Sequence, residues 1–283
     1  MKNINFCIKK INYIFRTSIV NFFRDGCLIK AAGLSWILFL TIIPIAILII
    51  SIAGRVLPAG ESIVRFTDLF FNFVDQFSPT QISSFQSVID NAFKSSYTSS
   101  IVASLVMLWS LFVFYSWIES IFSIIWRAKV KKRNLILSKL RGFGIMFLMI
   151  LFLVFSLFIY NTLQLLIQFV DTSTILKLPQ QTSKIILYVL NLVLAGFSFF
   201  TFFKWISPKK VNTKAAFFSA LLSLSIELFA LFFYQIYLEF FSKASFIYGS
   251  MFSIIIIFVW MDYTMITLLF GCEFCKTLHQ SLN

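Results

Sequence analysis

The 283-residue chain has few charged residues: Asp, Glu, Lys and Arg make up only 12% of it, whereas about 25% is usual in soluble domains. So few charges cannot supply the polar surface that a soluble domain of this length needs. Hydrophobic residues make up 59% of the chain, and 38 of its residues are phenylalanine. These proportions exclude an ordinary soluble protein and indicate a chain surrounded by lipid.

Histidine and catalytic motifs are also scarce. The chain has one histidine, His279, and it lacks a GxSxG nucleophile elbow, an HExxH motif and a glycine-rich phosphate loop. Cys272, Cys275 and His279 have a spacing that would present three metal ligands from one helix face, but a single CxxC is common by chance in apolar sequence. We therefore predict no enzyme, no bound metal and no cofactor.

Acidic residues are outnumbered, with 11 Asp and Glu against 24 Lys and Arg, which gives a formal net charge of +13. Such an excess in a soluble protein would suggest a nucleic-acid partner. Here the basic residues lie in short segments between hydrophobic runs, where such residues orient a chain in the membrane. The chain has no soluble domain in which basic residues alternate with aromatic residues that could stack on bases. We predict no nucleic-acid partner.

Six hydrophobic runs are each long enough to cross about 30 Å of hydrocarbon as a helix. Lys and Arg are concentrated in alternate segments between the runs, above all in residues 1–30, 127–141 and 204–214. Under the positive-inside rule, both termini are then cytoplasmic. We predict an all-α polytopic membrane protein with six transmembrane helices, at about residues 34–53, 101–126, 143–170, 185–206, 215–238 and 247–272.

Two segments outside these runs have the periodicity of amphipathic helices. In the first 30 residues, Lys9 and Arg16 fall away from an apolar face formed by Ile4, Ile8, Ile11, Phe15, Ile19 and Phe22. This pattern predicts a basic helix on the cytoplasmic membrane surface. The loop 54–99 has the pattern of two further amphipathic helices, which meet near Ser78, where the second helix begins. The predicted organisation is a cytoplasmic helix, 1–30, and a membrane domain, 31–283, with the outer insertion 54–99.

Three acidic residues, Glu119, Glu227 and Asp262, fall within the hydrophobic runs, where a charge is costly. Glu227 and Asp262 both lie about 18 Å along their helices from the predicted cytoplasmic ends, and no Lys or Arg lies at that depth. Such carboxyl groups are either protonated and bonded between helices, or they line a wet path for a cation or proton. The sequence leaves both interpretations open.

Residues in the first two runs resemble those of a known family. The stretch Ala31–Leu34, followed by Pro44, is similar to the Ala-Ala-x-Leu run and proline of the family's first helix. The stretch from Leu108-Trp109-Ser110 to Trp126 is similar to its second helix. Pro44 also removes one backbone donor, which serves either as a simple kink or as a hinge.

The last run carries the most specific likeness. Tyr248, Gly249 and Ser250, then Trp260, and finally Gly271 to Phe274 are similar to the Tyr-Gly-Ser, tryptophan and Gly-Ala-Glu-Phe of the family's last span. In these features the chain resembles the YihY/virulence factor BrkB family, formerly labelled ribonuclease BN. The nuclease label conflicts with the sequence, which has no metal-ligand cluster and no soluble nuclease domain.

The resemblance implies a six-helix protein of the bacterial inner membrane and marks Glu273 as a candidate residue at the inner end of the last helix. Our first hypothesis is a transporter or lipid-handling permease, in which Glu119, Glu227, Asp262 and Glu273 line a polar path. The alternative is an envelope scaffold that acts through its outer amphipathic helices and transports nothing. Membrane lipids are the predicted partners, a lipid or an ion is the predicted substrate, and no oligomeric state is predicted.

Overall fold

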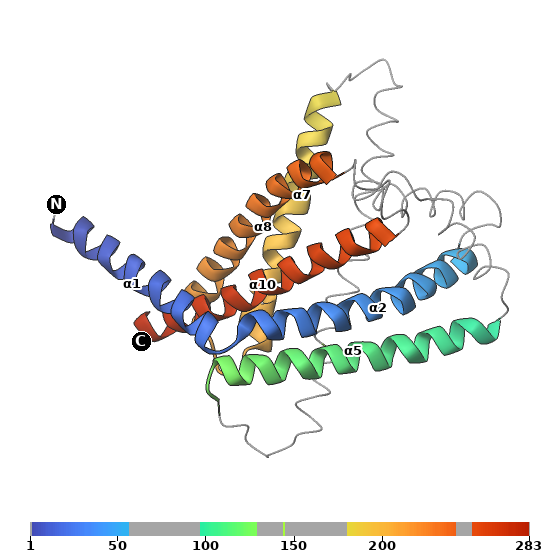
Figure 1. Cartoon of the computed structure of the whole chain (residues 1–283), viewed down its shortest axis with the longest axis horizontal. Helices are drawn as coiled ribbons and strands as arrows, with labels where there is room; N and C mark the ends of the chain where they lie inside the picture. The colour runs from blue at the N-terminus through green and yellow to red at the C-terminus, as the bar shows by residue number, and fades with distance from the viewer. Residues whose placement is uncertain (1, 57–96, 129–143, 145–179, 242–250, 283) are drawn as a thin grey trace. The chain divides into compact units, whose positions relative to one another are not determined.

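The computed structural model describes residues 2–56, 97–128, 144, 180–241 and 251–282. The regular structure within these residues is helical (Figure 1). The elements are α1 (Lys2–Arg24), α2 (Cys27–Val56), α5 (Tyr97–Ile125), α7 (Gln180–Thr201), the π-helical turn η1 (Phe202–Ile206), α8 (Thr213–Phe241) and α10 (Met251–Leu282).

These helices coincide with five of the six predicted hydrophobic runs, and the run at 143–170 lies almost wholly outside the described residues. Three stretches of the described chain are long and apolar enough to cross a membrane: Leu108–Ile125, Thr213–Phe233 and Ile257–Leu282. Cys27–Thr41 and Leu192–Ile206 are shorter apolar helices. The described residues thus agree with a helical chain that has membrane-capable helices. The number of six spans and the helices of the outer insertion 54–99 stay predictions.

Many large apolar side chains lie exposed on these helices, as expected in a lipid environment. Trp109 on α5 is 71% exposed, and Phe229 on α8 is 65% exposed. Soluble proteins rarely leave many large apolar side chains together on the surface, because water makes such exposure unfavourable. In hydrocarbon the same side chains are in a matching solvent.

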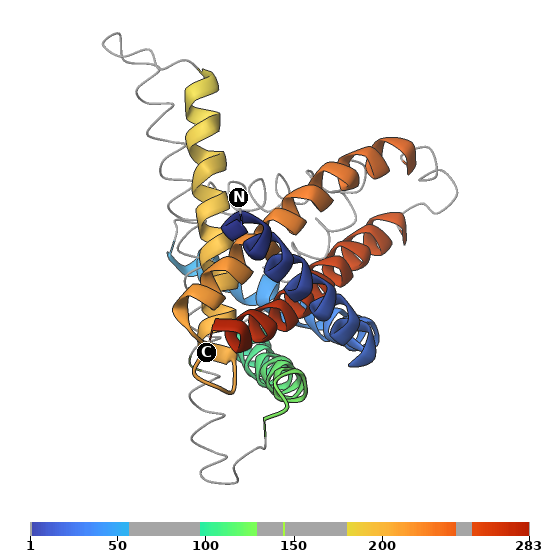
Figure 2. The same cartoon turned by 90° about the vertical axis from the view of Figure 1, so that its left-hand side faces the viewer.

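Helix α1 confirms the prediction of an N-terminal helix, but its buried stripe differs from the predicted apolar face. Ile14, Ser18 and Phe22 are buried at successive i+4 positions, while Phe15 stays partly exposed. The reason is the neighbouring helix: α1 meets the C-terminal part of α10 (Figures 1 and 2), where the rings of Phe15 and Phe22 each lie 5.8 Å from that of Phe270. Tertiary packing, and not the membrane surface alone, selects this face.

The described chain forms two compact units. The first unit comprises Met1–Cys27, Glu119–Phe229 and Thr267–Asn283, and its core includes Phe122, Phe203 and Leu269. The second unit comprises Leu28–Ile118 and Ala230–Ile266. In the second unit, Phe258 of α10 makes edge-on contacts with Trp36 and Phe39 of α2, with ring centroids 6.0 and 6.1 Å apart.

Candidate functional site

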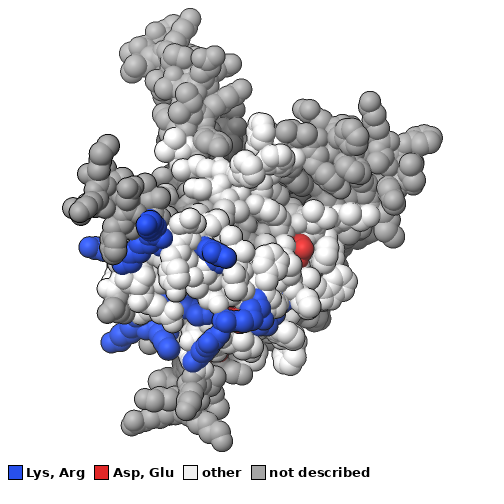
Figure 3. Space-filling model, turned by 60° about the vertical axis from the view of Figure 1, so that its left-hand side comes forward, with Lys and Arg blue, Asp and Glu red and all other residues white. Residues whose placement is uncertain are grey.

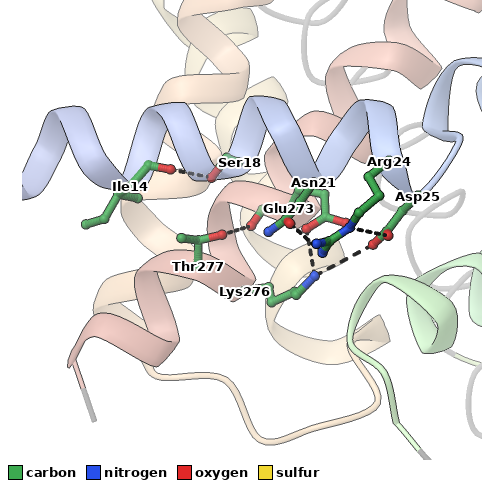
Figure 4. Close-up of polar contacts among 8 residues, drawn as sticks. All are labelled: Ile14, Ser18, Asn21, Arg24, Asp25, Glu273, Lys276 and Thr277. Atoms are coloured by element: carbon green, nitrogen blue, oxygen red, sulfur yellow. Dashed lines mark hydrogen bonds and ion pairs between the residues drawn. The ribbon is translucent and has the colours of Figure 1, made fainter.

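Three ionisable side chains are buried together in the first unit: Asp25, Glu273 and Lys276 (Figure 4). The Nζ atom of Lys276 lies 2.9 Å from Oε2 of Glu273 and 3.8 Å from Oδ2 of Asp25. The Glu273 side chain is 0% exposed, that of Lys276 5% and that of Asp25 13%. Two carboxyl groups thus share one ammonium group that is almost fully buried. We call these three residues the ionic network.

Local backbone structure places Asp25 in this network. Asp25 follows the end of α1, where its N–H donates to the carbonyl of Asn21 at 2.8 Å. Gly26 comes next with φ of 63°, a left-handed conformation that glycine adopts without steric cost and that commonly ends a helix. Helix α2 begins directly afterwards at Cys27. The tight connection between α1 and α2 therefore presents the Asp25 carboxyl group to α10.

The other two members of the network come from one face of α10. Glu273 and Lys276 are three residues apart, so their side chains are neighbours on the helix surface. The Thr277 hydroxyl donates to the Glu273 carbonyl at 2.9 Å on the same face. At the edge of the network, Nε of Arg24 lies 3.7 Å from Oδ1 of Asp25, and this side chain reaches solvent. Asp25 is thus paired with two basic side chains, Arg24 at the surface and Lys276 inside.

Burial makes this network energetically sensitive. Moving charged groups out of water costs several kcal/mol for each ion, and close pairing offsets that cost only while all partners are present. Removing one partner of a buried pair typically costs about 3–5 kcal/mol. The ionic network thus holds the α1–α2 connection against α10. Binding of a proton or a cation would change the charge of this network.

Helix α10 packs very closely in the turn that precedes Glu273. A Cβ atom added at Gly271 would lie 2.5 Å from Cζ of Phe203 on η1, and closer still to Oγ of Ser223 on α8. No side chain larger than a hydrogen atom fits there without displacing a neighbour. The close approach holds the Glu273 turn of α10 firmly against η1 and α8.

A family model described as virulence factor BrkB matches residues 18–283 of the chain. The chain belongs to the BrkB virulence factor family. No curated protein and no solved structure matches it. Together with its apolar helices, membership of the BrkB family makes the chain an integral membrane protein.

The BrkB match covers the motif residues on which the predicted resemblance rested, and the structure places some of them. Gly271 is the close-packing position described above, and Trp260 on α10 stacks on Tyr263, with ring centroids 6.3 Å apart. Pro44 lies within α2. Tyr248, Gly249 and Ser250, and the side chain of Pro44, lie outside the described residues.

The predicted path residues of this BrkB family protein fall in both units. Glu119 on α5 and Glu227 on α8 are half-buried members of the first unit, as is the fully buried Glu273. Asp262 on α10 is half-buried in the second unit, and its Oδ1 accepts a hydrogen bond of 3.1 Å from the Ser35 hydroxyl of α2. That these four acids line one path stays a prediction.

The surroundings of Cys272, Cys275 and His279 near the C-terminus differ from those of metal ligands. The side chains of Cys272 and Cys275 are buried as free thiols. Nδ1 of His279 accepts a hydrogen bond of 3.3 Å from the backbone N–H of Asn212, and its ring lies 5.7 Å from that of Trp126. Across the described helices, no three His, Cys, Asp or Glu side chains are arranged to hold a metal ion.

Asp25 and Lys276 were not predicted as site residues. Lys276 had a signal in the sequence, because it follows Glu273 at the i+3 spacing that pairs charges on a helix. Asp25 had none, since its position beside Lys276 results from the packing of α1 on α10, at the other end of the chain.

Proposed function

We propose that this BrkB family protein is a transporter or lipid-handling permease of the bacterial inner membrane. The observation that carries the proposal is the ionic network, because Glu273 and Lys276 lie on the stretch of α10 that is apolar enough to span a membrane. Ionisable residues in membrane helices are costly and commonly mark the pathways of ions, protons or substrates.

The orientation that we propose places the ionic network at the cytoplasmic side, with both termini in the cytoplasm. Figure 3 shows Lys and Arg side chains gathered on one face. In the first unit, exposed basic residues on α1, on the η1–α8 connection and after α5 include Lys9, Arg16, Lys209 and Arg127. Such an excess supports a cytoplasmic location under the positive-inside rule.

In this proposal the ionic network couples the binding of a proton or cation to a change in helix packing. Two carboxyl groups compete for the Lys276 ammonium, so a proton or cation that neutralises Glu273 leaves Lys276 to pair with Asp25. That exchange changes the contact between α10 and the α1–α2 connection. A local charge change of this kind can bias an element that has two packing arrangements. Glu119, Glu227 and Asp262 are proposed to line the remainder of the path.

The proposal contains no enzymatic step, no cofactor and no nucleic-acid partner, because the sequence offers no motif for any of these. Membrane lipids are the proposed partners. The alternative function, an envelope scaffold, depends on the outer insertion 54–99, most of which lies outside the described residues.

Flux measurements on purified protein in proteoliposomes test the proposal. Vesicles with and without protein are compared for proton, sodium and potassium flux under imposed gradients, and for flipping of a fluorescent phosphatidylglycerol. We expect at least one of these activities, and we expect Glu273→Gln to abolish it. The matched control is Thr277→Val, which changes the same face of α10 without changing its charge. Wild-type vesicles that behave like empty vesicles in every assay would contradict the proposal.

A further inference from the structure

An open groove of about 530 Å³ lies beside the start of α8 in the first unit. Phe200 from the end of α7 lines it, together with Thr213, Lys214, Phe217 and Phe218 from the first turns of α8. Phe217 and Phe218 are both more than half exposed, and their rings meet edge to face with centroids 6.0 Å apart. The groove therefore combines an aromatic wall with an exposed ammonium group.

The connection before α8 places a second ammonium group at the groove. Helix α7 ends in the π-helical turn η1, and Lys204 within this turn reaches back over the connection. Its Nζ donates to the Val211 carbonyl and to the Thr213 hydroxyl, both at 2.8 Å. Because Thr213 lines the groove, the charge of Lys204 is held beside it. π-helical turns are rare and occur frequently at functional sites.

The lysines around the groove form a cluster of positive charge. Lys209 and Lys210 are exposed on the connection that leads to Lys214. In the described parts of the chain, no ion pair joins Lys204, Lys209, Lys210 or Lys214 to an acidic residue. The rim therefore attracts a negatively charged ligand, while the wall favours an apolar one.

We propose that this groove binds one anionic phospholipid of the surrounding bilayer. An acyl chain lies against Phe200, Phe217 and Phe218, and the phosphate pairs with Lys214, with Lys204 beside it. Basic side chains next to membrane-embedded apolar surface recognise anionic headgroups in this manner. A zwitterionic headgroup has no net charge, so the lysines attract it less strongly. A soluble anion has no acyl chain to contact the aromatic wall. The inference requires only that the chain lies in a membrane, so it stands apart from the transport proposal.

Native mass spectrometry of the full chain in detergent tests this site. The probes are phosphatidylglycerol and phosphatidylcholine with identical acyl chains. Wild-type protein should retain phosphatidylglycerol in preference, and Lys214→Gln should weaken its retention about fivefold, because one lysine near an anionic headgroup contributes on that order. Lys214→Arg keeps the charge and should retain the lipid.

The matched control is Lys9→Gln, which removes an exposed lysine of α1 that does not line the groove. It should leave the preference for phosphatidylglycerol unchanged. Substituting both Phe217 and Phe218 by serine should weaken retention of the two lipids alike, because it removes the apolar wall. An equal loss in Lys9→Gln and Lys214→Gln, or no loss in Lys214→Gln, would overturn the inference. Displacement of phosphatidylglycerol by inorganic phosphate alone would also overturn it, since the site would then bind only anions.

Discussion

Helix α10 carries two acidic residues in contrasting surroundings, one in each unit. Glu273 is fully buried and lies 2.9 Å from the ammonium of Lys276, whereas Asp262 is half-buried and accepts a hydrogen bond from the neutral Ser35 hydroxyl. An ammonium partner forms an ion pair with a carboxyl group, whereas a hydroxyl contributes a single neutral hydrogen bond. The comparison shows that two acids on one apolar helix are stabilised by different physical means.

The largest expected effect comes from removing the cation of the ionic network. Lys276→Met preserves the length of the side chain but leaves Asp25 and Glu273 buried without their shared ammonium. We expect a loss of about 3–5 kcal/mol in the free energy of unfolding, as for other broken buried pairs. Unfolding in mixed micelles measures it.

The matched substitution in the second unit is Asp262→Asn, since the amide oxygen still accepts from Ser35. We expect it to change the free energy of unfolding by less than about 1 kcal/mol. Equal effects of Lys276→Met and Asp262→Asn would remove the distinction between the two acids.

Substitutions at two glycines, one in each unit, compare how closely the two units are packed. Gly271→Ala places a Cβ against Phe203 and Ser223, and overpacking of this kind costs about 1–3 kcal/mol. Gly33→Ala is the control in the second unit, because an added Cβ there meets nothing within 4 Å. Alanine favours the helix over glycine, so thermal unfolding of Gly33→Ala should occur at the same or a higher temperature. The reverse ranking would contradict the close packing at Gly271.

A smaller effect is expected from the hydroxyl partner of Asp262. Ser35→Ala removes the hydroxyl that lies 3.1 Å from Oδ1 of Asp262 and 2.9 Å from the Ala32 carbonyl of its own helix. It should lower the free energy of unfolding by about 1 kcal/mol. Ser225→Ala is the control, because the Ser225 hydroxyl is exposed and donates only to the Leu221 carbonyl of its own helix. Equal unfolding midpoints for the two variants would show that Ser35 does not support Asp262.

The smallest effect is expected at the exposed edge of the ionic network. Arg24→Gln removes an exposed ion pair, and such pairs contribute about 0–1 kcal/mol. The difference from wild type should disappear at high salt, because salt screens exposed charges. Unfolding midpoints at low and high ionic strength measure this. A loss as large as that of Lys276→Met would mean that Arg24 belongs to the buried part of the network.

The sequence predicts the helices well because lipid imposes a simple rule: a long apolar run must bond its backbone internally. The runs that became α2, α5, α8 and α10 follow it. Within the site, the motif resemblance identified Glu273 and Gly271 but not their roles. The role of Gly271 depends on Phe203 and Ser223, and that of Glu273 on Asp25, all far away in the chain. For Lys214 the sequence predicted only a role in orienting the chain in the membrane. Its place in a groove could not be predicted, because Phe200, which also lines the groove, comes from another helix.

The central claim is that the ionic network serves transport in addition to stability. A triple variant, Asp25→Asn with Glu273→Gln and Lys276→Met, tests it, because it removes all three buried charges while keeping the side chains similar in size. Replacing buried ion pairs by neutral groups is often neutral or stabilising. Measured in the same proteoliposomes as the wild type, this variant should be folded and as stable, and yet inactive. Full activity in the triple variant would contradict the claim and leave the network a purely structural device.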